Sequence, residues 1–389
     1  MKKKKMVRKK HKKDFEVTPW SVEGKVDYDR LTKEFGLKLI DNKILERIKK
    51  HTNELHLFLR RKIFFAHRDL DWILDKYEQG EKFFLYTGRG PSGRTHIGHM
   101  IPWIFTKWLQ DKFDCELYFQ ITDDEKFLIK KQSFEEIEKN VEENLLDIAA
   151  IGFNPEKTYI IQNTKDIKLL YKIAIKIARN VTYSTASAVF GFKKESNIGI
   201  IFFPALQASP CFLPSVLNKK NIPCLIPAAV DQDPYWRGIA RYVAPKLGFY
   251  KPAQIHSKLL PGLKGEKMSS SEPESCIFTT DSEDDIERKV WKALTGGQKS
   301  LKEQKEKGGD PNICLVYKYL FYLFEENDEK IEKIYNECKS GERFCGDCKK
   351  YLADKIKEFL REHKKKRSMV KIEDYKKNLN VLEEKLNKG

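Results

Sequence analysis

The chain has 389 residues, of which 40% are hydrophobic and 34% charged, so it is long enough for two or three domains with hydrophobic cores. No apolar run reaches membrane-spanning length and the first residues lack an apolar signal region, so a cytoplasmic protein without a membrane partner is expected. The eight cysteines then argue against a disulfide scaffold, since disulfides persist in oxidising compartments. The formal net charge of +17 favours a polyanionic partner.

Charge and hydrophobic patterning divide the chain into four segments. Residues 1–14 form a basic tail that is expected to be disordered, and it either steers RNA, acts as an address or has no partner. Residues 15–80 form an N-terminal extension of short strands and helices. Residues 81–281 alternate strands and helices, and residues 282–389 contain only amphipathic helices, punctuated by basic runs such as His363–Arg367.

The segment 81–281 predicts an α/β domain. Strands are expected at Lys82–Thr87, Glu116–Ile121, Tyr159–Gln162, Cys224–Val230 and Gln254–His256. Helices are expected at Met100–Phe113, from the capping box Ser133–Glu136, at Asp166–Asn180, after Pro204 and after Pro234. This alternation is typical of a Rossmann-like parallel sheet with helices on both faces, which binds ligands beyond the carboxyl ends of its strands.

The stretch Tyr86–His99 joins the first of these strands to the helix that follows it through a glycine-rich loop. A helix start offers unpaired N–H groups and a positive dipole end, which suit phosphate. His96 and His99 are three residues apart, so both rings can donate to one polyphosphate, and Gly98 between them leaves room for a flat base. An ordinary helix with two surface histidines is the alternative interpretation.

A second motif, Lys264-Gly-Glu-Lys-Met-Ser-Ser-Ser-Glu272, lies in a downstream loop. His-Ile-Gly-His followed at this distance by Lys-Met-Ser-Ser-Ser resembles the two signatures of class I aminoacyl-tRNA synthetases. Further stretches are similar to tryptophanyl-tRNA synthetases of the eukaryotic and archaeal branch: Tyr86–Ser92, Gln120–Lys126, Phe203–Pro210 and Ala229–Arg237. This resemblance covers most of residues 15–389. It implies L-tryptophan and tRNA(Trp) as substrates, a homodimer, and anticodon binding by residues 282–389, whose last helix packs back on the catalytic domain.

The resemblance also implies a tryptophan pocket. The indole N–H only donates, so it needs a buried acceptor, and the matching positions are Tyr86 and Gln120. Without the resemblance, Tyr86 would be interpreted as the last aromatic residue of a strand. Further positions are expected to bind the amino acid and its ammonium: Thr122, Glu125, Gln207 and Gln232. Asp231 is a weaker candidate, and Asp123 and Asp124 are interpreted as solvated acids at a helix start.

The same resemblance implies an ATP site. The catalytic residues are expected to be His96, His99 and Lys267, with Lys267 delivered to the leaving pyrophosphate by a loop that closes on ATP. Mg²⁺ would accompany ATP, held mostly by phosphate oxygens and water. Many class I enzymes have a second lysine where this chain has Ser271, which places more of the charge requirement on Lys267. The remaining ATP-binding positions are Arg89, Gly90, Gly98, Met268, Ser269 and Ser270.

Three other functions compete with this interpretation. The tyrosine counterpart shares the fold, but it would need an acid in the pocket, and none stands at the matching strand ends. A catalytically retired RNA-binding paralogue would not be expected to keep His96, His99, Lys267 and Glu125. Small nucleotidyltransferases carry His-x-Gly-His but lack the long helical domain.

Four cysteines fall in the helical segment: Cys314, Cys338, Cys345 and Cys348. Their spacing resembles an iron–sulfur motif of some bacterial tryptophanyl-tRNA synthetases, offset by about one residue in the longest gap. Zinc on four thiolates is a second interpretation, and free thiols on a helix pair are a third.

Overall fold

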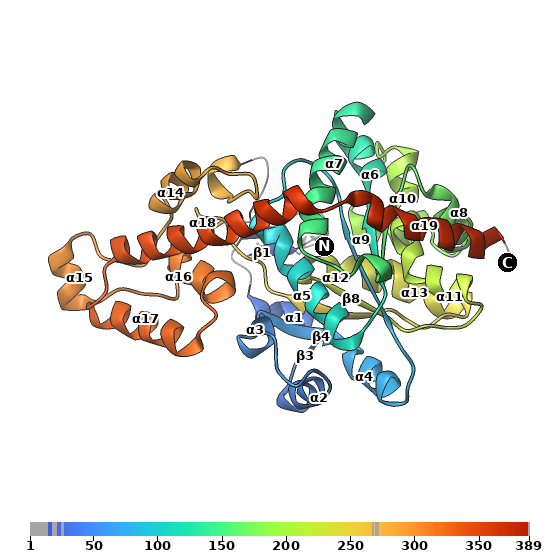
Figure 1. Ribbon diagram of the computed structural model, residues 1–389. Coiled ribbons are helices and arrows are strands. Elements are labelled where there is room, and N and C mark those ends of the chain that lie inside the picture. The colour runs from blue at the N-terminus through green and yellow to red at the C-terminus, as the bar shows by residue number, and fades with distance from the viewer. Residues whose placement is uncertain (1–14, 18–21, 25–26, 267, 269–271, 388–389) are drawn as a thin grey trace, which may run out of the picture.

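The computed structural model describes residues 15–17, 22–24, 27–266, 268 and 272–387. In this part of the chain a seven-stranded sheet is enclosed by helices, and a separate group of helices extends to one side (Figure 1). None of the described helices combines the length and the apolar composition needed to cross a lipid bilayer.

The strands form a two-stranded sheet, β1 with β2, and the seven-stranded sheet. They are β1 (Phe15–Val17), β2 (Val22–Gly24), β3 (Lys38–Leu39), β4 (Phe64–Arg68), β5 (Phe84–Arg89), β6 (Leu117–Ile121), β7 (Thr158–Gln162), β8 (Cys224–Ala229) and β9 (Ala253–Ser257).

The helices fall into those that surround the sheet and those that follow it. The first group is α1 (Tyr28–Phe35), α2 (Asn42–Thr52), α3 (Leu57–Arg60), α4 (Leu70–Glu78), α5 (Ile97–Phe113), α6 (Asp123–Ile129), α7 (Phe134–Ala150), α8 (Ile167–Ala178), α9 (Tyr183–Phe190), α10 (Ile198–Ala208), α11 (Leu213–Leu217), α12 (Asp233–Tyr235) and α13 (Arg241–Val243). The second group is α14 (Glu283–Trp291), α15 (Leu301–Lys307), α16 (Leu315–Tyr319), α17 (Asp328–Ser340), α18 (Cys345–Met369) and α19 (Ile372–Asn387).

Shorter turns link several of these helices. The single-turn 3₁₀ segments are η1 (Pro155–Lys157), η2 (Ser209–Cys211), η3 (Val230–Gln232), η5 (Ala244–Leu247) and η6 (Pro273–Ser275), and the π-helical segments are η4 (Trp236–Ala240) and η7 (Leu320–Phe324).

The large sheet has the order β3-β4-β9-β8-β5-β6-β7. The five strands from β9 to β7 are parallel, which confirms the Rossmann-like fold. The chain moves outward from β5 to β6 and β7, then returns to the other side of β5 to form β8 and β9. Such a reversal of strand order opens a ligand-binding crevice at the carboxyl ends of the two central strands, here β5 and β8.

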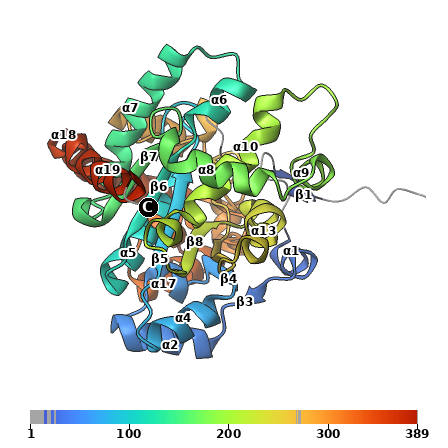
Figure 2. The ribbon, with the colours of Figure 1, turned by 90° about the vertical axis from the view of Figure 1, so that its right-hand side faces the viewer.

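Side chains alternate between the two faces of the sheet, as the pleat requires. Along β5, Leu85 packs in the core that includes α5 and α7, whereas Phe84 and Tyr86 pack in the core that includes α8 and α10. The view in Figure 2 shows helices on both sides of the sheet. Both faces are covered, which explains why β6, with the sequence Leu-Tyr-Phe-Gln-Ile, is apolar at nearly every position and buried throughout.

The sheet differs from the predicted one at its edge. The sequence predicts a sheet built from residues 81–281 alone, but β3 and β4 of the N-terminal extension join it, and both pair antiparallel. The strand β4 is almost completely buried, because it lies beside β9 inside the sheet. The extension is therefore fixed to the catalytic sheet by backbone hydrogen bonds.

Two helices were predicted to begin at proline. The prediction at Pro234 is confirmed, since this residue lies in the first turn of α12, which continues through a π-helical segment. The prediction at Pro204 is wrong, because α10 begins earlier, at Ile198, and runs through the proline. Proline inside a helix removes a backbone hydrogen bond, and the packing around α10 tolerates this loss.

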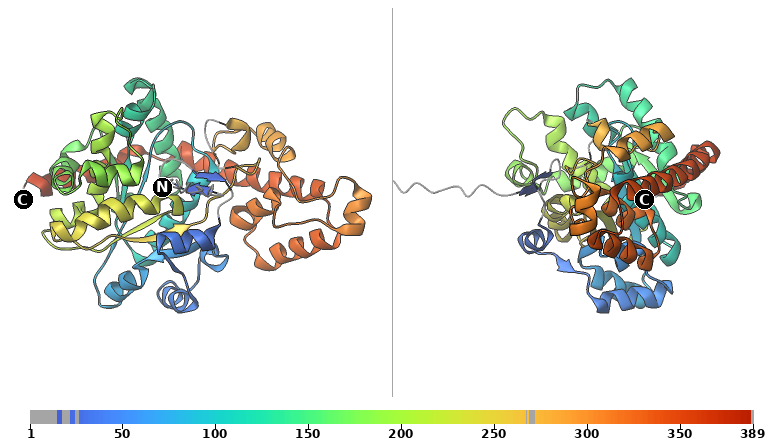
Figure 3. Two further views of the ribbon diagram at one scale, coloured as in Figure 1. Left: turned by 180° about the vertical axis from the view of Figure 1, so that it is seen from behind. Right: turned by 90° about the vertical axis from the view of Figure 1, so that its left-hand side faces the viewer.

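The helices α14–α18 form the group at the side, and α18 is the element that returns toward the sheet (Figure 1). The following helix, α19, packs along β7, the outermost parallel strand. Its Tyr375 hydroxyl donates to the backbone carbonyl of Phe153 at 2.9 Å. Figure 3 shows the same two helices, in red, from behind and from the side of the helical group. This covering helix protects the edge strand from pairing with another chain.

Candidate active site

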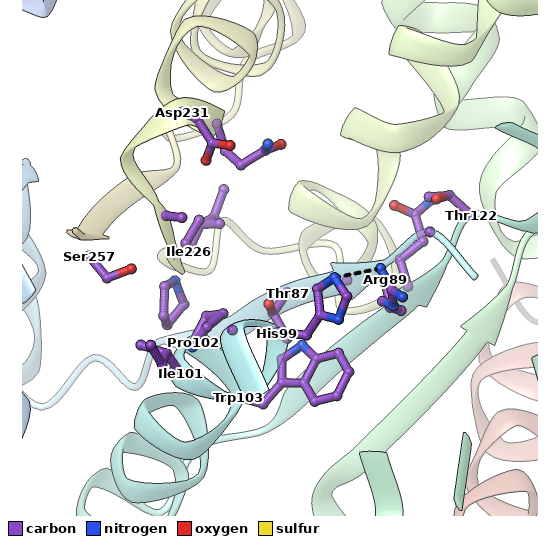
Figure 4. Close-up of a pocket in the computed structure, with 18 of the residues that line it drawn as sticks. Thr87, Arg89, His99, Ile101, Pro102, Trp103, Thr122, Ile226, Asp231 and Ser257 are labelled. Atoms are coloured by element: carbon purple, nitrogen blue, oxygen red, sulfur yellow. Dashed lines mark hydrogen bonds between the residues drawn. The ribbon is translucent and has the colours of Figure 1, made fainter. Parts of the chain in front are cut away.

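A cavity of about 380 Å³ opens where β5 and β8 separate. The two strands pair only at Phe84 with Cys224 and at Leu85 with Leu225. Beyond these pairs they diverge, and Tyr86–Arg89 and Ile226–Ala229 line opposite walls of the cavity. Figure 4 shows Arg89 and His99 across from Ile226 and Asp231. We call this cavity the central pocket.

The two histidines lie at the N-terminus of α5 and line the central pocket. Their rings stack with centroids 3.5 Å apart. The backbone N–H of His96 donates to Nδ1 of His99 at 3.2 Å, so a neutral His99 ring carries its proton on Nε2. That Nε2 lies 3.1 Å from Nη1 of Arg89, which also only donates. An anion that lies beside both groups would accept a hydrogen bond from each.

Arg89 supplies a positive charge at the end of β5. Its Nε donates to the Asn144 side-chain oxygen at 2.8 Å, and its Nη2 is buried without a hydrogen-bond partner among the described residues. Burial lowers the pKa of Arg89 to about 10, so the guanidinium stays charged at neutral pH. A buried, unpaired cationic donor is unfavourable until an anion arrives.

The acceptors expected for an indole N–H lie together at the other end of the central pocket. The Tyr86 hydroxyl contacts Oε1 of Gln120 and lies 2.7 Å from the Gln207 backbone carbonyl. Burial raises the pKa of Tyr86 well above its usual value, so the phenol keeps its proton. The ring of Trp236 meets the Tyr86 ring edge to face, with centroids 5.3 Å apart.

Gln120 is oriented by residues that were not among the predicted site residues. Its Nε2 donates to Oδ1 of Asn163 at 2.8 Å, and Nδ2 of Asn163 donates to Asp124 at 2.7 Å. These contacts direct the Gln120 oxygen toward Tyr86. The interpretation of Asp123 and Asp124 as solvated acids is wrong, because Asp123 is buried against Thr164 and Asp124 is largely enclosed.

Glu125 is a buried carboxylate on the wall of the central pocket. It accepts from the Thr122 hydroxyl at 2.9 Å and pairs with Nζ of Lys126 at 2.8 Å. A side chain at Gly90 would place its Cβ 2.7 Å from that Nζ, so a larger residue there would force the Lys126 side chain to move. Lys126 lines the pocket but was not among the predicted site residues, although it lies in the first turns of α6, within the Asp-Asp-Glu-Lys stretch that follows β6.

The remaining predicted residues enter from three elements. Gln207 of α10 and Gln232 of η3 line the central pocket, as does Asp231. Met268 lines it as well, and a Cβ at Gly98 would lie 3.3 Å from its sulfur, so a bulkier residue at Gly98 would crowd this contact. Three predicted residues lie outside the described part of the chain: Lys267, Ser269 and Ser270.

The four cysteines of the helical segment line one small enclosed cavity together with Arg343. Nε of Arg343 donates to the Cys348 sulfur at 2.9 Å, and burial raises the pKa of Cys338 to about 11. Among the described residues, no group of three or more His, Cys, Asp or Glu side chains is arranged to hold a metal ion. The iron–sulfur, zinc and free-thiol interpretations all stay predictions, and iron and zinc analysis of anaerobically purified protein separates them.

Comparisons with known proteins agree with this geometry. A family model for class I tRNA synthetases (W and Y) matches residues 78–361. The tryptophan–tRNA ligase of Pyrococcus abyssi is 54% identical over 370 residues, covering 93% of this chain and 94% of the relative. That of Pyrococcus furiosus is 52% identical and covers 97% of each chain. Plasmodium falciparum tryptophanyl-tRNA synthetase has a similar crystal structure, with a TM-score of 0.85, 40% identity, and coverage of 90% of this chain and 97% of that one. This chain therefore belongs to the tryptophanyl-tRNA synthetases, within the class I aminoacyl-tRNA synthetases.

Proposed function

We infer that this chain ligates L-tryptophan to tRNA(Trp) in two steps. Tryptophan and ATP first form tryptophanyl-adenylate with release of pyrophosphate, and the aminoacyl group then passes to the 3′-terminal ribose of the tRNA. One observation carries the inference beyond family membership. The central pocket is lined both by hydrogen-bond donors suited to phosphate, at Arg89 and His99, and by acceptors suited to indole, at Tyr86 and Gln120.

Tryptophan selection rests on the acceptors Tyr86 and Gln120. Phenylalanine has no indole N–H, so it would leave these buried oxygens without that donor, which discriminates far more strongly than a missing methylene group. Among the described residues, no carboxylate contacts the Tyr86 and Gln120 pair, whereas a tyrosine substrate would require an acceptor for its hydroxyl. Glu125, with Gln207 and Gln232, would bind the substrate ammonium.

The first step needs alignment and charge stabilisation. The tryptophan carboxylate is already a nucleophile and attacks the α-phosphorus in line, so no general base is required. Negative charge develops on the phosphate oxygens as pyrophosphate leaves. We propose that His96, His99 and Arg89 stabilise this charge. All three line the pocket before ATP arrives, and donors held in place in advance are the condition for effective electrostatic stabilisation.

The loop that contains Met268 would complete the ATP site. We propose that Lys267 neutralises the leaving pyrophosphate, and that Gly90, Gly98, Met268, Ser269 and Ser270 contact the nucleotide. Among the described residues that line the central pocket, the carboxylates are Glu125 and Asp231. Since Glu125 is paired with Lys126, this donor set fits a Mg²⁺ ion held mainly by ATP oxygens and water, where it would neutralise phosphate charge.

A homodimer fits an exposed apolar area of the catalytic domain. Phe127 and Phe134 stack at 4.0 Å between ring centroids, and Asn197 donates to the Leu128 carbonyl, which brings Ile198 beside them. Ile198 is 85% exposed. We call Phe127, Ile129, Phe134 and Ile198 the α6–α10 patch; the helices α6 and α10 lie side by side (Figure 2). Contiguous exposed apolar groups are typical of an interface.

ATP–pyrophosphate exchange tests the function. Exchange is expected with tryptophan and not with tyrosine or phenylalanine, followed by charging of tRNA(Trp). Gln120→Ala is expected to raise KM for tryptophan about tenfold or more, with KM for ATP changed less than about threefold. Exchange with tyrosine would establish the tyrosine counterpart instead. Absence of exchange with every amino acid, combined with RNA binding, would establish the retired paralogue.

A further inference from the structure

The basic run His363–Arg367 is not simply a solvated face of α18. The side chains at its two ends turn inward, where α18 packs against α7. Nε2 of His363 lies 2.9 Å from Oδ1 of Asp147, and these two side chains are only 4% and 3% exposed. Arg367 approaches the same oxygen at 3.3 Å. Burying a charged carboxylate is unfavourable without such partners, so this contact sets how α18 sits on the catalytic domain.

The second oxygen of Asp147 contacts Thr279, which in turn contacts the segment just before α5. Oγ1 of Thr279 lies 3.1 Å from Oδ2 of Asp147 and 3.3 Å from the Thr95 carbonyl. A hydroxyl has one proton, and the nearer, charged carboxylate is the stronger acceptor. The backbone N–H of Thr279 also donates to the Thr95 carbonyl at 3.0 Å. Asp147 therefore orients Thr279, and Thr279 holds Thr95.

Thr95 directly precedes His96, so its position is transmitted to the catalytic loop. The adjoining residues reinforce the contact, since His96 forms a bridge with Phe278 and the Ile97 N–H donates to the Ile277 carbonyl at 3.0 Å. These are backbone interactions, which fix where α5 begins.

The same face of α7 supports the other side of the loop. Asn144, one helical turn before Asp147, accepts from Arg89 and donates to the Gly93 carbonyl at 2.9 Å. A further link joins α18 to the segment next to Thr279, because Lys364 donates to the Asp281 carbonyl. The Asp281 side chain is itself buried against Lys289 at 2.6 Å. The contacts of α18 thus converge on the segment that clamps the loop.

We propose that Asp147, Thr279 and His363 are positioning residues for tryptophan activation. They set the position of Thr95, and through it of His96, relative to the ATP phosphates. They also tie this geometry to the seating of α18, and hence of the helical group, on the catalytic domain. The proposal rests on the function proposed above for His96.

Removing the Thr279 hydroxyl tests the central link. Thr279→Val keeps the shape of the side chain and the backbone hydrogen bond to Thr95, whereas Thr279→Ser keeps the hydroxyl as well. We expect Thr279→Val to lower kcat/KM for ATP about tenfold in the exchange assay, with KM for tryptophan within about twofold of the unmodified protein. Thr279→Ser is expected to restore the rate.

The helix end of the link is tested with His363. His363→Leu removes the donor to Asp147, while His363→Gln keeps a nitrogen at nearly the same reach. His363→Leu is expected to lower kcat/KM for ATP as Thr279→Val does. His363→Gln is expected to keep the kcat/KM of the unmodified protein. If Thr279 and His363 both act through Asp147, the double variant Thr279→Val with His363→Leu should have a kcat/KM for ATP only slightly below that of either single variant. Arg361→Gln, which removes an exposed ion pair between α18 and α14, is the matched control.

Thermal unfolding is measured for every variant, so that rates are compared only below the transition. Thr279→Val and His363→Leu rates that match the unmodified protein would overturn the proposal. The proposal would also be overturned if Thr279→Ser and His363→Gln lost as much exchange activity as Thr279→Val and His363→Leu. A parallel rise of KM for tryptophan and for ATP would overturn it too, because a merely structural role predicts both results. His96→Ala separates the two levels: if it leaves exchange intact, the proposed function of His96 fails, whatever the outcome at Thr279.

Discussion

The hydroxyl group of Tyr86 contributes both to the structure of the central pocket and to its expected specificity. Its hydroxyl closes the end of the central pocket between Gln120 and the Gln207 carbonyl, and the side chain is 1% exposed. The hydroxyl has one proton and two lone pairs, so it can donate to the protein and still accept from a ligand. The position of Gln120 is held in turn by Asn163. A small displacement of the Tyr86 hydroxyl or the Gln120 amide would therefore weaken tryptophan binding before it affected other properties.

Tyr86→Phe is therefore expected to raise KM for tryptophan about tenfold, since an unsatisfied buried acceptor costs on the order of 1–3 kcal/mol. KM for ATP should stay within about twofold. Tyr235→Phe is the matched control, because its hydroxyl donates to the Pro204 carbonyl at 3.1 Å and does not line the pocket. The control should lower the melting temperature and leave both KM values unchanged. Equal effects of the two substitutions on KM for tryptophan would contradict this role for Tyr86.

Asp124 predicts a pH dependence of stability. Burial raises its pKa from 3.8 to about 7, although Asn163 donates to it and acts in the opposite direction. A carboxyl whose pKa is higher in the folded state favours folding fully below pH 3.8, and this contribution is lost as the pH rises through about 7.

Asp124→Asn removes this titration while keeping an acceptor for Asn163. Between pH 5 and pH 8, the stability of the variant should rise relative to the unmodified protein by on the order of 2 kcal/mol. Thermal unfolding of both proteins across this range is the measurement. Parallel curves of melting temperature against pH would show that Asp124 titrates in the same way in the folded and unfolded states.

At the scale of elements, α7 has an unusual number of roles. It begins at a capping box, in which the Ser133 hydroxyl accepts from the Glu136 N–H at 3.2 Å and the Glu136 carboxylate accepts from the Ser133 N–H at 3.1 Å. Its later turns carry Asn144 and Asp147, which support the catalytic loop and receive α18. The helix therefore connects the phosphate end of the pocket to the helical group.

Ser133→Ala should reduce the free energy of unfolding by about 1 kcal/mol, the usual cost of losing a cap. Because Ser133 lies at the far end of α7 from Asp147, the exchange kinetics should not change. Ser133→Thr should restore stability. Ser340→Ala is the control, since that exposed hydroxyl only contacts the Glu337 carbonyl at the end of α17. Urea-induced unfolding provides the measurement. A loss of activity in Ser133→Ala without a loss of stability would contradict the role of Ser133 as a helix cap.

At the scale of the whole molecule, the helical group and the catalytic sheet are joined by long-range contacts. The helix α18 extends from one to the other, and α19 continues along the edge strand β7 (Figure 1). Arg61, in the loop before β4, adds a further connection by donating to Asp328 at 2.7 Å and to the Phe321 carbonyl. The N-terminal extension and α18 thus both help to seat the helical group.

The α6–α10 patch predicts the oligomeric state. We expect the unmodified protein to sediment as a dimer, and Phe127→Asp with Phe134→Asp to sediment as a monomer, because charges within an apolar interface are costly to desolvate. Leu301→Asp is the control, since Leu301 is 68% exposed on α15, away from the patch. Analytical ultracentrifugation measures this directly. If the variant with Phe127→Asp and Phe134→Asp is still a dimer, the interface lies elsewhere. If the unmodified protein is a monomer, the proposed homodimer is wrong.

The sequence by itself determined the local features of this protein. Buried parallel strands are recognisable as continuous apolar runs, and a glycine-rich turn into a helix is recognisable from neighbouring residues. The Rossmann-like fold, the capping box at Ser133 and the family followed from such patterns. The resemblance, and not the strand pattern, placed Tyr86 and Gln120 together. Their side chains do touch, although the strand register pairs Tyr86 with Tyr118 and Gly88 with Gln120.

Only the tertiary structure decided features that depend on distant segments. The short strand β3 and the placement of β4 beside β9 depend on pairing partners, and the path of α10 through Pro204 depends on packing around it. The burial of Asp124 could not be inferred from its polar side chain. The contact between Asp147 and His363 joins positions 216 residues apart, and within the sequence His363 stands only as part of a basic run. The physical reason is the same in each case: local sequence determines which structure a segment favours, whereas burial and pairing are properties of the assembled chain.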